Sequence, residues 1–187
     1  SHGKALVAVL EGVPAGLPVT EEYIAVDMRR RQGGYGRSRR QQIEVDRAEI
    51  VGGVRHGKTL GSPIAMVVAN KVWEDWQEVM QVGPSETEPK RLTRLRPGHA
   101  DLAGAMKYGF DDARNILERA SARETAARVA VGAVCRRFLE EFGIAVHSHT
   151  ASISDIFANV DGEPDWTAVE ESDVRCADAE AGERMCR

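Results

Sequence analysis

The strongest helical pattern of the chain starts at Ser121 and stops at Gly143, and it fixes where a core can form. Ser121 and Glu124 have the spacing of a capping box. The apolar residues beyond them recur at helical intervals, at Ala127, Val131, Val134 and Phe138. Extended back by one turn, this stripe reaches Arg123, so a guanidinium lies on the inward side of the helix start. A cation there is unfavourable unless an anion accompanies it, which predicts a bound anion; an arginine that extends to solvent is the alternative.

The segments before this helix alternate between apolar runs and turn residues. The runs at 4–10, 43–51 and 63–69 predict strands, the first of them buried. A helix is predicted from Thr20, a capping residue, to about Arg31. The stretch from 71 to 97 has no clear period and is expected to form a long ordered loop, after which further helices follow. This order of elements predicts an α+β fold rather than an alternating βαβ series.

A basic cluster lies between Arg29 and Arg47, where seven arginines occur in a chain whose net charge is −4. Three glycines among the arginines let the backbone take positive φ and fold the basic groups toward one point, which favours a site for a small anion. A solvated, disordered loop is one alternative, and a small nucleic-acid-binding module is another. Because the cluster has a single aromatic, Tyr35, and the pI is about 5.8, nucleic-acid binding is the weakest of the three.

The composition is that of an ordinary globular domain. With 187 residues, 42% hydrophobic and 29% charged, the chain can bury one substantial core. It has neither an apolar run long enough to span a bilayer nor an N-terminal signal pattern, so we expect a cytoplasmic protein with no membrane partner. The three cysteines lack C-x-x-C spacing and predict reduced thiols, and His147 and His149 have no third ligand at a matching spacing, so no metal site is expected.

The sequence from Arg96 to Asp101 places a histidine, His99, between a long loop and a predicted helix. Pro97 and Gly98 impose an irregular backbone just before it. A histidine near a helix N-terminus can donate a proton close to neutral pH, and Arg96 adds a positive charge for an anion. These residues alone predict an anion site with an acid histidine, although a solvated, inert histidine stays open as the alternative.

Five motifs occur in one order along the chain: Ser1-His-Gly3, Arg29-Arg-Arg-Gln-Gly-Gly-Tyr-Gly-Arg37, Gly61-Ser-Pro-Ile64, Arg96-Pro-Gly-His-Ala-Asp101 and Arg119-Ala-Ser-Ala-Arg-Glu-Thr-Ala-Ala-Arg128. Together they closely resemble chorismate synthase, in the same order and at similar spacing. The resemblance covers nearly the whole chain up to about Ser154. Any single motif would be unspecific, whereas five in register make the resemblance highly specific.

The resemblance implies a carbon–oxygen lyase of the shikimate pathway that acts on a phosphate ester. Its substrate, 5-enolpyruvylshikimate 3-phosphate, loses phosphate and a ring proton in a 1,4-anti elimination that gives chorismate. Such enzymes require reduced FMN although the reaction has no net redox change, and the sequence leaves open whether NADPH reduces the flavin on the same protein. The implied fold is a β-α-β sandwich, with helices between antiparallel sheets, in a homotetramer that has no nucleic-acid partner.

The resemblance also implies roles for residues of this chain. His2 matches the histidine that protonates the reduced flavin, and His99 matches the one that protonates the departing phosphate. The implied substrate-binding residues are Ser1, Arg31, Arg40, Arg96 and Arg123. The implied FMN contacts are Arg119, Ala120 and Ser121, and a nucleotide or NADPH position matches Arg31 and Arg37.

The resemblance leaves part of the family's length unmatched. The family motif reads Gly-Glu-Ser-His-Gly, whereas this chain starts at Ser1 and stops about halfway along the family. We expect residues 1–154 to be the N-terminal portion of a single domain. Residues 155–187, with ten acids against three arginines, are expected to be a poorly ordered segment that leads into the missing half. The chain alone is then expected to be inactive, because the missing half supplies further flavin contacts and a catalytic aspartate.

Overall fold

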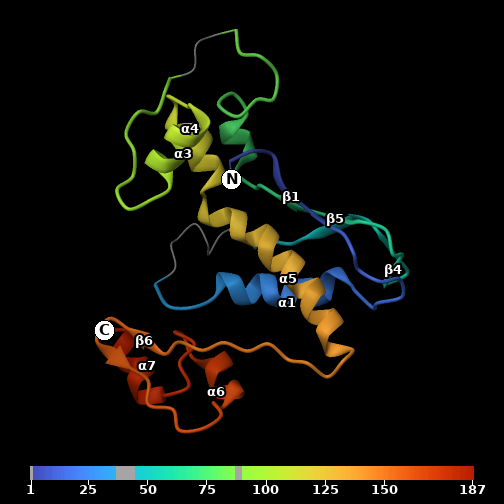
Figure 1. The fold of residues 1–187 in the computed structure, drawn as a ribbon, viewed down its shortest axis with the longest axis vertical. Helices are drawn as coiled ribbons and strands as arrows, with labels where there is room; N and C mark the ends of the chain where they lie inside the picture. Colours follow the sequence, from blue (N-terminus) through green and yellow to red (C-terminus); the bar gives the residue numbers. More distant parts are fainter. Residues whose placement is uncertain (1, 37–44, 87–89) are drawn as a thin grey trace. The chain divides into compact units, whose positions relative to one another are not determined.

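The structure of the chain, a computed structural model, describes residues 2–36, 45–86 and 90–187. It contains two compact units, of which the first comprises Ser1–Met28 and Asp46–Cys135 and the second comprises Arg29–Val45 and Arg136–Arg187. The elements in chain order (Figure 1) are β1 (Ala5–Leu10), α1 (Glu21–Gln32), β2 (Glu49–Gly52), β3 (Val54–Arg55), β4 (Lys58–Thr59), β5 (Ile64–Ala69), the 3₁₀ helix η1 (Trp73–Trp76), α3 (Asp101–Tyr108), α4 (Ala113–Arg119), the 3₁₀ helix η2 (Ala122–Glu124), α5 (Thr125–Glu140), β6 (Ser152–Ile153), β7 (Ile156–Phe157), α6 (Trp166–Glu171) and α7 (Ala179–Met185).

Most elements predicted from the sequence are present. The runs at 4–10 and 63–69 form β1 and β5. The helix predicted from Thr20 is α1, and the Thr20 hydroxyl accepts a hydrogen bond from the Tyr23 N–H (3.2 Å), as a cap should. The pattern that starts at Ser121 forms η2 followed directly by α5. Helices together with antiparallel strands confirm the α+β class.

A three-stranded antiparallel sheet with the order β1-β5-β2 organises the first unit. Its register sets three pairs on one face: Leu6 with Val68, Ala8 with Met66 and Leu10 with Ile64. Within β5 these positions are buried and the alternate ones are less so, as the period of two in a strand requires. On the other side of β5, β2 pairs with a register shift between Ile50 and Gly52. Of the strand predicted at 43–51, the positions 43 and 44 lie outside the described residues.

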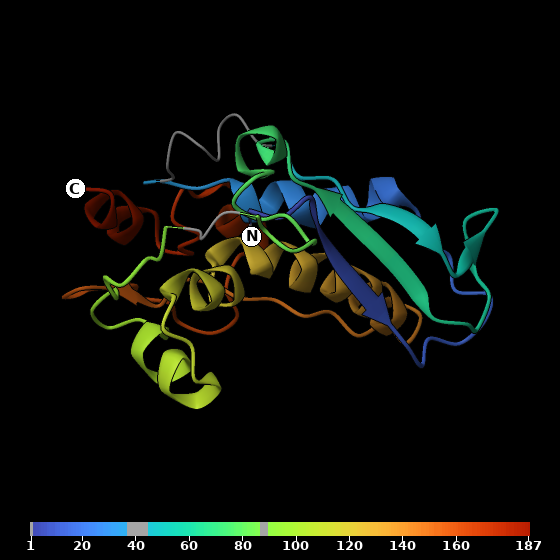
Figure 2. The same ribbon diagram turned by 90° about the horizontal axis from the view of Figure 1, so that it is seen from above.

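The inward face of this sheet is covered by α1 and α5, with which it forms the core (Figure 2). Ile24 and Met28 of α1 are fully buried. The buried residues of α5 are Ala126, Ala130, Ala133 and Val134. The predicted inward stripe was therefore wrong in part, because Phe138 is 36% exposed. Alanines allow the helix backbone to approach the sheet closely, so small residues rather than the larger apolar ones form the contact face.

The outward face of the sheet is open in this structure. Val7 and Val9 of β1 are 65% and 62% exposed, and Val51 of β2 is 56% exposed. The prediction of a buried first strand was thus wrong for Val7 and Val9, and the inward residues Leu6, Ala8 and Leu10 are only partly buried. Contiguous apolar side chains on a sheet face are typical of a surface that packs against further protein.

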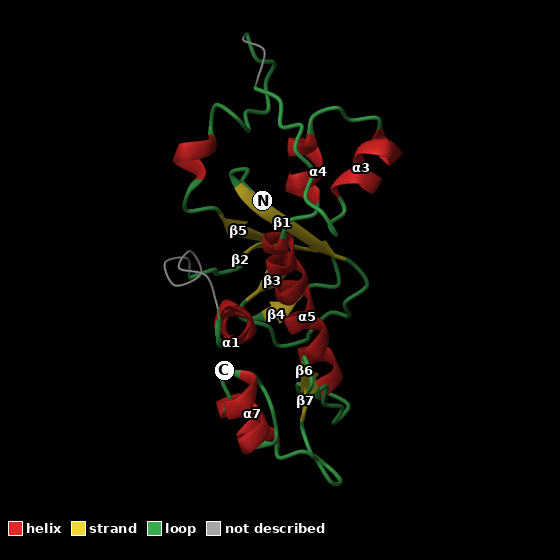
Figure 3. Ribbon diagram, turned by 90° about the vertical axis from the view of Figure 1, so that its left-hand side faces the viewer, coloured by secondary structure: helices red, strands yellow, loops and turns green. Residues whose placement is uncertain are grey.

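The second unit contains the acidic segment, in which the sequence predicted poor order. The structure differs, since this segment contains β7, α6 and α7 (Figure 3). Two of the acids act as helix caps: Asp165 accepts from the N–H groups of Thr167 and Ala168, and Asp178 accepts from that of Ala181. A small apolar cluster of Cys176, Ala181 and Met185 packs with Ile156. The apolar pattern of the sequence therefore did not predict these helices, whose first turns are capped by aspartates. The predicted domain boundary after Ser154 stays a prediction.

Gly53 closes the turn that follows β2, and its geometry admits no side chain. Its φ is +86°, and a Cβ placed on it would lie 2.3 Å from the carbonyl oxygen of Pro63, at the start of the β5 segment. A Cβ on the neighbouring Gly52 would meet no atom within 4 Å, which makes this glycine a natural comparison.

We expect Gly53→Ala to destabilise the protein by roughly 2–6 kcal/mol, because left-handed strain and overpacking each cost about 1–3 kcal/mol. Urea unfolding of the whole protein measures this change. Gly52→Ala is the control and should shift the free energy of unfolding by less than about 1 kcal/mol. Equal midpoints for the two variants would contradict the close approach of Gly53 to Pro63.

Candidate functional site

The antiparallel register brings three chain segments to one edge of the sheet. Ala5 pairs with Ala69, and Glu49 pairs with Val67, so the start of β1, the end of β5 and the entry to β2 lie together. Asn70 fastens this edge: its N–H donates to the Lys4 carbonyl (3.0 Å), and its side-chain amide donates to the Gly3 carbonyl (2.9 Å). Residues 2–4, which precede β1, are thereby fixed at this edge.

Arg123 reaches the same edge from the start of α5. Its Nη1 lies 2.9 Å from Oδ1 of Asp46, and its Nη2 donates to the Ala69 carbonyl (3.1 Å). The side chains of Arg123 and Asp46 are only 10% and 3% exposed. The predicted inward position of this guanidinium is confirmed, and the alternative in which it extends to solvent is wrong. The anion that accompanies it in this structure is a carboxylate of the protein itself.

His2 is held by a carboxylate from α4. One oxygen of Glu118 accepts from the backbone N–H of His2 (2.7 Å), and the other lies 2.6 Å from the ring Nδ1. The ring also lies against Trp76 in a tilted arrangement, with 4.0 Å between centroids and 39° between the ring planes. The guanidinium of Arg114 lies 5.1 Å from the Trp76 ring centroid. The Glu118 carboxylate thus fixes both the backbone and the ring of His2.

The loop that contains His99 is closed by Asp101, the first residue of α3. The Asp101 carboxylate accepts three hydrogen bonds from Arg96: from the backbone N–H (2.8 Å), from Nε (2.9 Å) and from Nη2 (2.7 Å). The Nδ1 of His99 lies 3.4 Å from Oδ1 of the same carboxylate. Hydrogen bonds from Arg96 hold the pKa of Asp101 well below its usual range, although its burial acts in the opposite direction.

The helices that carry these two carboxylates pack directly on each other. A Cβ at Gly104 of α3 would lie 2.7 Å from Cγ2 of Ile116 in α4, so only glycine allows this approach. The loop before His99 is bonded to α4 as well, since the Ala113 N–H donates to the Leu92 carbonyl (2.7 Å) and the Leu92 N–H to Asp112 (3.0 Å). His2 and His99 are therefore attached to one helix pair, α3 and α4.

The predicted FMN contacts lie between α4 and α5. Arg119 ends α4, with its guanidinium 5.7 Å from the centroid of the Tyr108 ring, and Ala120 follows it. Ser121 caps η2 by accepting from the Arg123 N–H (3.2 Å). A guanidinium next to the start of a helical segment presents positive charge, which suits a phosphate monoester such as that of FMN. The residues present thus fit the phosphate end of this cofactor.

Four of the predicted site residues lie outside the described part of the first unit. Arg31 belongs to the second unit, on the last turn of α1. Ser1, Arg37 and Arg40 lie outside the described residues. Their predicted roles toward substrate and NADPH stay predictions.

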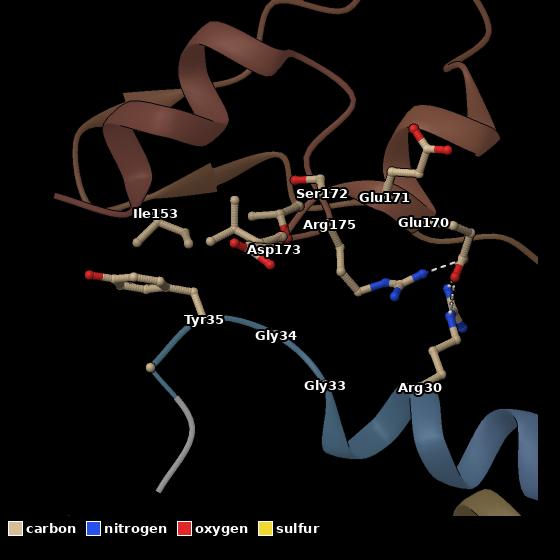
Figure 4. A pocket seen from close by; sticks show the side chains of 13 residues that line it. Arg30, Gly33, Gly34, Tyr35, Ile153, Glu170, Glu171, Ser172, Asp173 and Arg175 are labelled. Carbon is tan, nitrogen blue, oxygen red and sulfur yellow. Dashed lines mark hydrogen bonds and ion pairs between the residues drawn. The ribbon is translucent and has the colours of Figure 1, made fainter. Parts of the chain in front are cut away.

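The second unit contains a cavity of about 570 Å³ beside the described end of the basic cluster (Figure 4). Arg30 lines it, and its Nη2 lies 2.8 Å from Oε1 of Glu170, which Arg175 also contacts. Glu171 and Asp173 lie on the same wall. Three carboxylates thus accompany the two guanidiniums of this cavity, so Arg30 lies in a cavity of mixed charge.

Neither a cluster of metal-ligating side chains nor a membrane-spanning helix occurs in the described ranges. No group of three or more His, Cys, Asp or Glu side chains that could hold a metal occurs there. His147 and His149 instead contact the ring of Trp166, at 4.5 and 6.2 Å between centroids. No helix in these ranges is long and apolar enough to cross a membrane.

The sequence did not predict the residues that contact and orient the predicted site residues. Glu118, Asp46 and Trp76 carried no signal of their own, because each is distant in sequence from the residue that it contacts. Asp101 stood inside a quoted motif, and its spacing from Arg96 at the start of a helix could have suggested an ion pair within the loop.

Comparisons with known proteins agree with this arrangement. The family model described as chorismate synthase matches residues 1–187. Among curated relatives named chorismate synthase, that of Geobacillus thermodenitrificans (strain NG80-2) is 56% identical over 195 residues, covering 99% of this chain and 50% of the relative. That of Aquifex aeolicus (strain VF5) is 61% identical over 154 residues, covering 82% of this chain and 39% of the relative. The match to the first of these relatives covers nearly all of this chain but only half of the relative. The chain thus spans about half the length of such relatives.

A solved structure gives the same result for the fold. A chain described as the crystal structure of chorismate synthase aligns with a TM-score of 0.74 and 43% sequence identity. The alignment covers 98% of this chain and 48% of that one. The likeness therefore extends over both units of this chain, and it again covers about half of the longer chain.

We expect Arg123→Ala to destabilise the whole protein by about 3–5 kcal/mol, because the buried carboxylate of Asp46 would lose its counter-charge. Denaturant unfolding measures this change. Arg128→Ala is the matched control, since Arg128 pairs with Glu124 at the surface of the same helix and its loss should leave the midpoint nearly unchanged. If Arg123→Ala unfolded like the control while substrate affinity fell, the guanidinium would serve the ligand rather than Asp46.

Proposed function

The chain belongs to the chorismate synthase family, and we propose that the whole protein converts 5-enolpyruvylshikimate 3-phosphate to chorismate and phosphate. In this 1,4-anti elimination the ring C–O bond to phosphate breaks, a ring C–H bond loses its proton, and a new ring double bond forms. The protein would be a lyase of aromatic amino-acid biosynthesis. Such a reaction needs cationic groups for the substrate's phosphate and carboxylates, and a proton for the leaving group.

The observation that carries this proposal is the closed loop from Arg96 to Asp101. It presents a guanidinium and an imidazole from one short segment, with side chains that are 41% and 38% exposed, so both can reach a ligand while a buried carboxylate anchors them. Arg96 would bind an anionic group of the substrate, and His99 would donate a proton to the departing phosphate. Arg123 would contribute positive charge near the same helix ends, in addition to its bonds to Asp46.

The remaining residues of the edge suit the flavin. When bound, reduced FMN would supply the electron-rich character that the elimination requires without net oxidation or reduction. Arg119, Ala120 and Ser121 would hold its phosphate end. His2, held by Glu118 and Trp76, would exchange a proton with the flavin from a fixed position. Ser1, Arg31 and Arg40 would add contacts to the substrate, and Arg31 and Arg37 would form the nucleotide position if NADPH reduces the flavin here.

The resemblance further implies a cytoplasmic homotetramer with no nucleic-acid or membrane partner. Analytical ultracentrifugation of the whole protein measures the assembly directly. NADPH oxidation in the presence of FMN, measured without an added reductase, decides whether the protein reduces its own flavin.

An anaerobic assay tests the function itself. The whole protein is supplied with reduced FMN and 5-enolpyruvylshikimate 3-phosphate, and both chorismate absorbance and phosphate release are followed. We expect the two products to form in equal amounts and to need the reduced cofactor. Phosphate release without chorismate would mean that the protein is a phosphatase and not this lyase.

We expect His99→Ala to lower kcat by roughly 10²–10⁴-fold with a much smaller effect on substrate binding, because a general acid acts on the leaving group in the transition state. Steady-state kinetics of the whole protein give both values. His147→Ala, which removes an imidazole stacked on Trp166 in the second unit, is the control and should retain the wild-type kcat. An unchanged kcat in His99→Ala would remove His99 from the mechanism.

The 187-residue chain by itself is expected to form no chorismate and to bind FMN weakly. Its proposed flavin residues are limited to His2, Arg119, Ala120 and Ser121, and its sheet leaves Val7, Val9 and Val51 exposed. Flavin fluorescence titration and the anaerobic assay measure the two properties, with the whole protein as the positive control. Turnover by the 187-residue chain at a rate near that of the whole protein would overturn this expectation.

A further inference from the structure

The carboxylate of Asp101 takes no part in the proposed chemistry, yet it contacts both residues of the loop that do. Its side chain is completely buried, at 0% exposure, although it is the first residue of α3 and contacts two exposed side chains of the preceding loop, Arg96 and His99. Burying a charge is costly unless the charge is paired and hydrogen-bonded. Such an arrangement therefore indicates a role that a surface aspartate would not fill.

The carboxylate does not act as a helix cap. Although Asp101 opens α3, the capping position, Ala100, makes no side-chain cap bond. The hydrogen bonds that Asp101 accepts within the described part of the chain run backward to Arg96 rather than forward into the helix. A stabilising role at the helix start thus leaves these bonds unexplained.

For Arg96, the pair sets the plane of the guanidinium. Nε and Nη2 form the edge that faces the two oxygens of Asp101, in the forked geometry that arginine and carboxylates share. The edge that carries Nη1 then points away from the carboxylate. With the side chain 41% exposed, this second edge is oriented toward the surface where an anionic group can approach.

For His99, the same carboxylate lies within ion-pair distance of one ring nitrogen. The Nδ1 lies 3.4 Å from Oδ1, and the backbone N–H of His99 donates to the Arg96 carbonyl (3.3 Å), which closes the turn at Gly98. A carboxylate next to Nδ1 favours the proton on that nitrogen in the neutral ring and directs Nε2 to the opposite side. Nε2 is then the atom from which the protonated ring would give its proton to a phosphate oxygen as the C–O bond breaks, leaving the Nδ1–H tautomer.

We propose that Asp101 is a positioning residue for loss of the phosphate: one buried carboxylate orients Arg96 toward the anionic group and His99 with Nε2 toward the leaving oxygen. This inference rests on the proposed function for the identity of the leaving group. The placement of the two side chains by Asp101 is independent of that identity.

Kinetics of Asp101→Asn in the whole protein test the catalytic part. Asparagine keeps the shape but loses the charge, and misplacement of an acid by about 1 Å can cost on the order of 10²-fold in rate. We expect kcat to fall by about that factor and KM for the phosphate ester to rise, with partial recovery in Asp101→Glu. Rates are expressed per folded protein, counted by bound FMN, so that a loss of folded material does not count as a loss of catalysis.

Asp111→Asn is the matched control. Asp111 also pairs with an arginine, Arg91 at 2.6 Å, but both side chains are largely exposed. We expect its kcat and KM to equal those of the wild type. If Asp101→Asn had the wild-type kcat and KM per folded protein, the positioning role would be excluded.

Nitrogen-15 NMR of the histidine rings tests the placement without activity. In the unliganded wild-type protein, with His99 assigned by its absence in His99→Gln, we expect the Nδ1–H tautomer, and in Asp101→Asn a shift toward Nε2–H. An Nε2–H tautomer in the wild type would overturn the proposal even if Asp101→Asn did not fold. A wild-type protein that shows the expected tautomer but makes no chorismate would overturn the proposed function and support the placement.

Discussion

The neutralisation of two buried aspartates is the constraint on which the site depends. Asp46 and Asp101 are 4% and 0% exposed, and each is paired with an arginine, Arg123 or Arg96, that the sequence predicted to bind substrate. A buried carboxylate without its partner is strongly destabilising. These arginines therefore have a structural role before any ligand arrives, and each is held in place by the charge that it neutralises.

Topology places these pairs where a site can form. In an antiparallel sheet, the start of β1 and the entry to β2 both lie beside the end of β5, so His2, Asp46 and Ala69 come together although they are far apart in sequence. The α3–α4 pair, which depends on Gly104 for its close contact, then carries a carboxylate for each histidine. The result is a set of arginine and histidine side chains that carboxylates hold on helices and sheet ends, which is the kind of fixed arrangement that the proposed catalysis would require.

The sequence predicted those features of the fold and the site that depend on local residue patterns or on motifs. The start of α1 at Thr20 and the inward position of Arg123 follow from capping and helical spacing, and five motifs in register identified the family. The partners of the site residues could not be predicted, because Glu118 and Asp46 reach His2 and Arg123 through tertiary packing. The inward stripe of α5 was displaced because alanines, which carry little hydrophobic signal, form its contact face. The helices after Asp155 were missed because aspartate caps rather than apolar periodicity begin them.

A crystal structure of the whole protein with 5-enolpyruvylshikimate 3-phosphate and FMN, grown from the oxidised flavin to prevent turnover, tests the central claim most directly. The account predicts that the substrate's phosphate lies within hydrogen-bond distance of His99 Nε2 and near the Nη1 edge of Arg96, while Asp101 keeps its bonds to Arg96. A phosphate bound elsewhere, or a complex in which Arg96 leaves Asp101 to reach its ligand, would contradict the claim that the buried carboxylate sets the geometry of the loop.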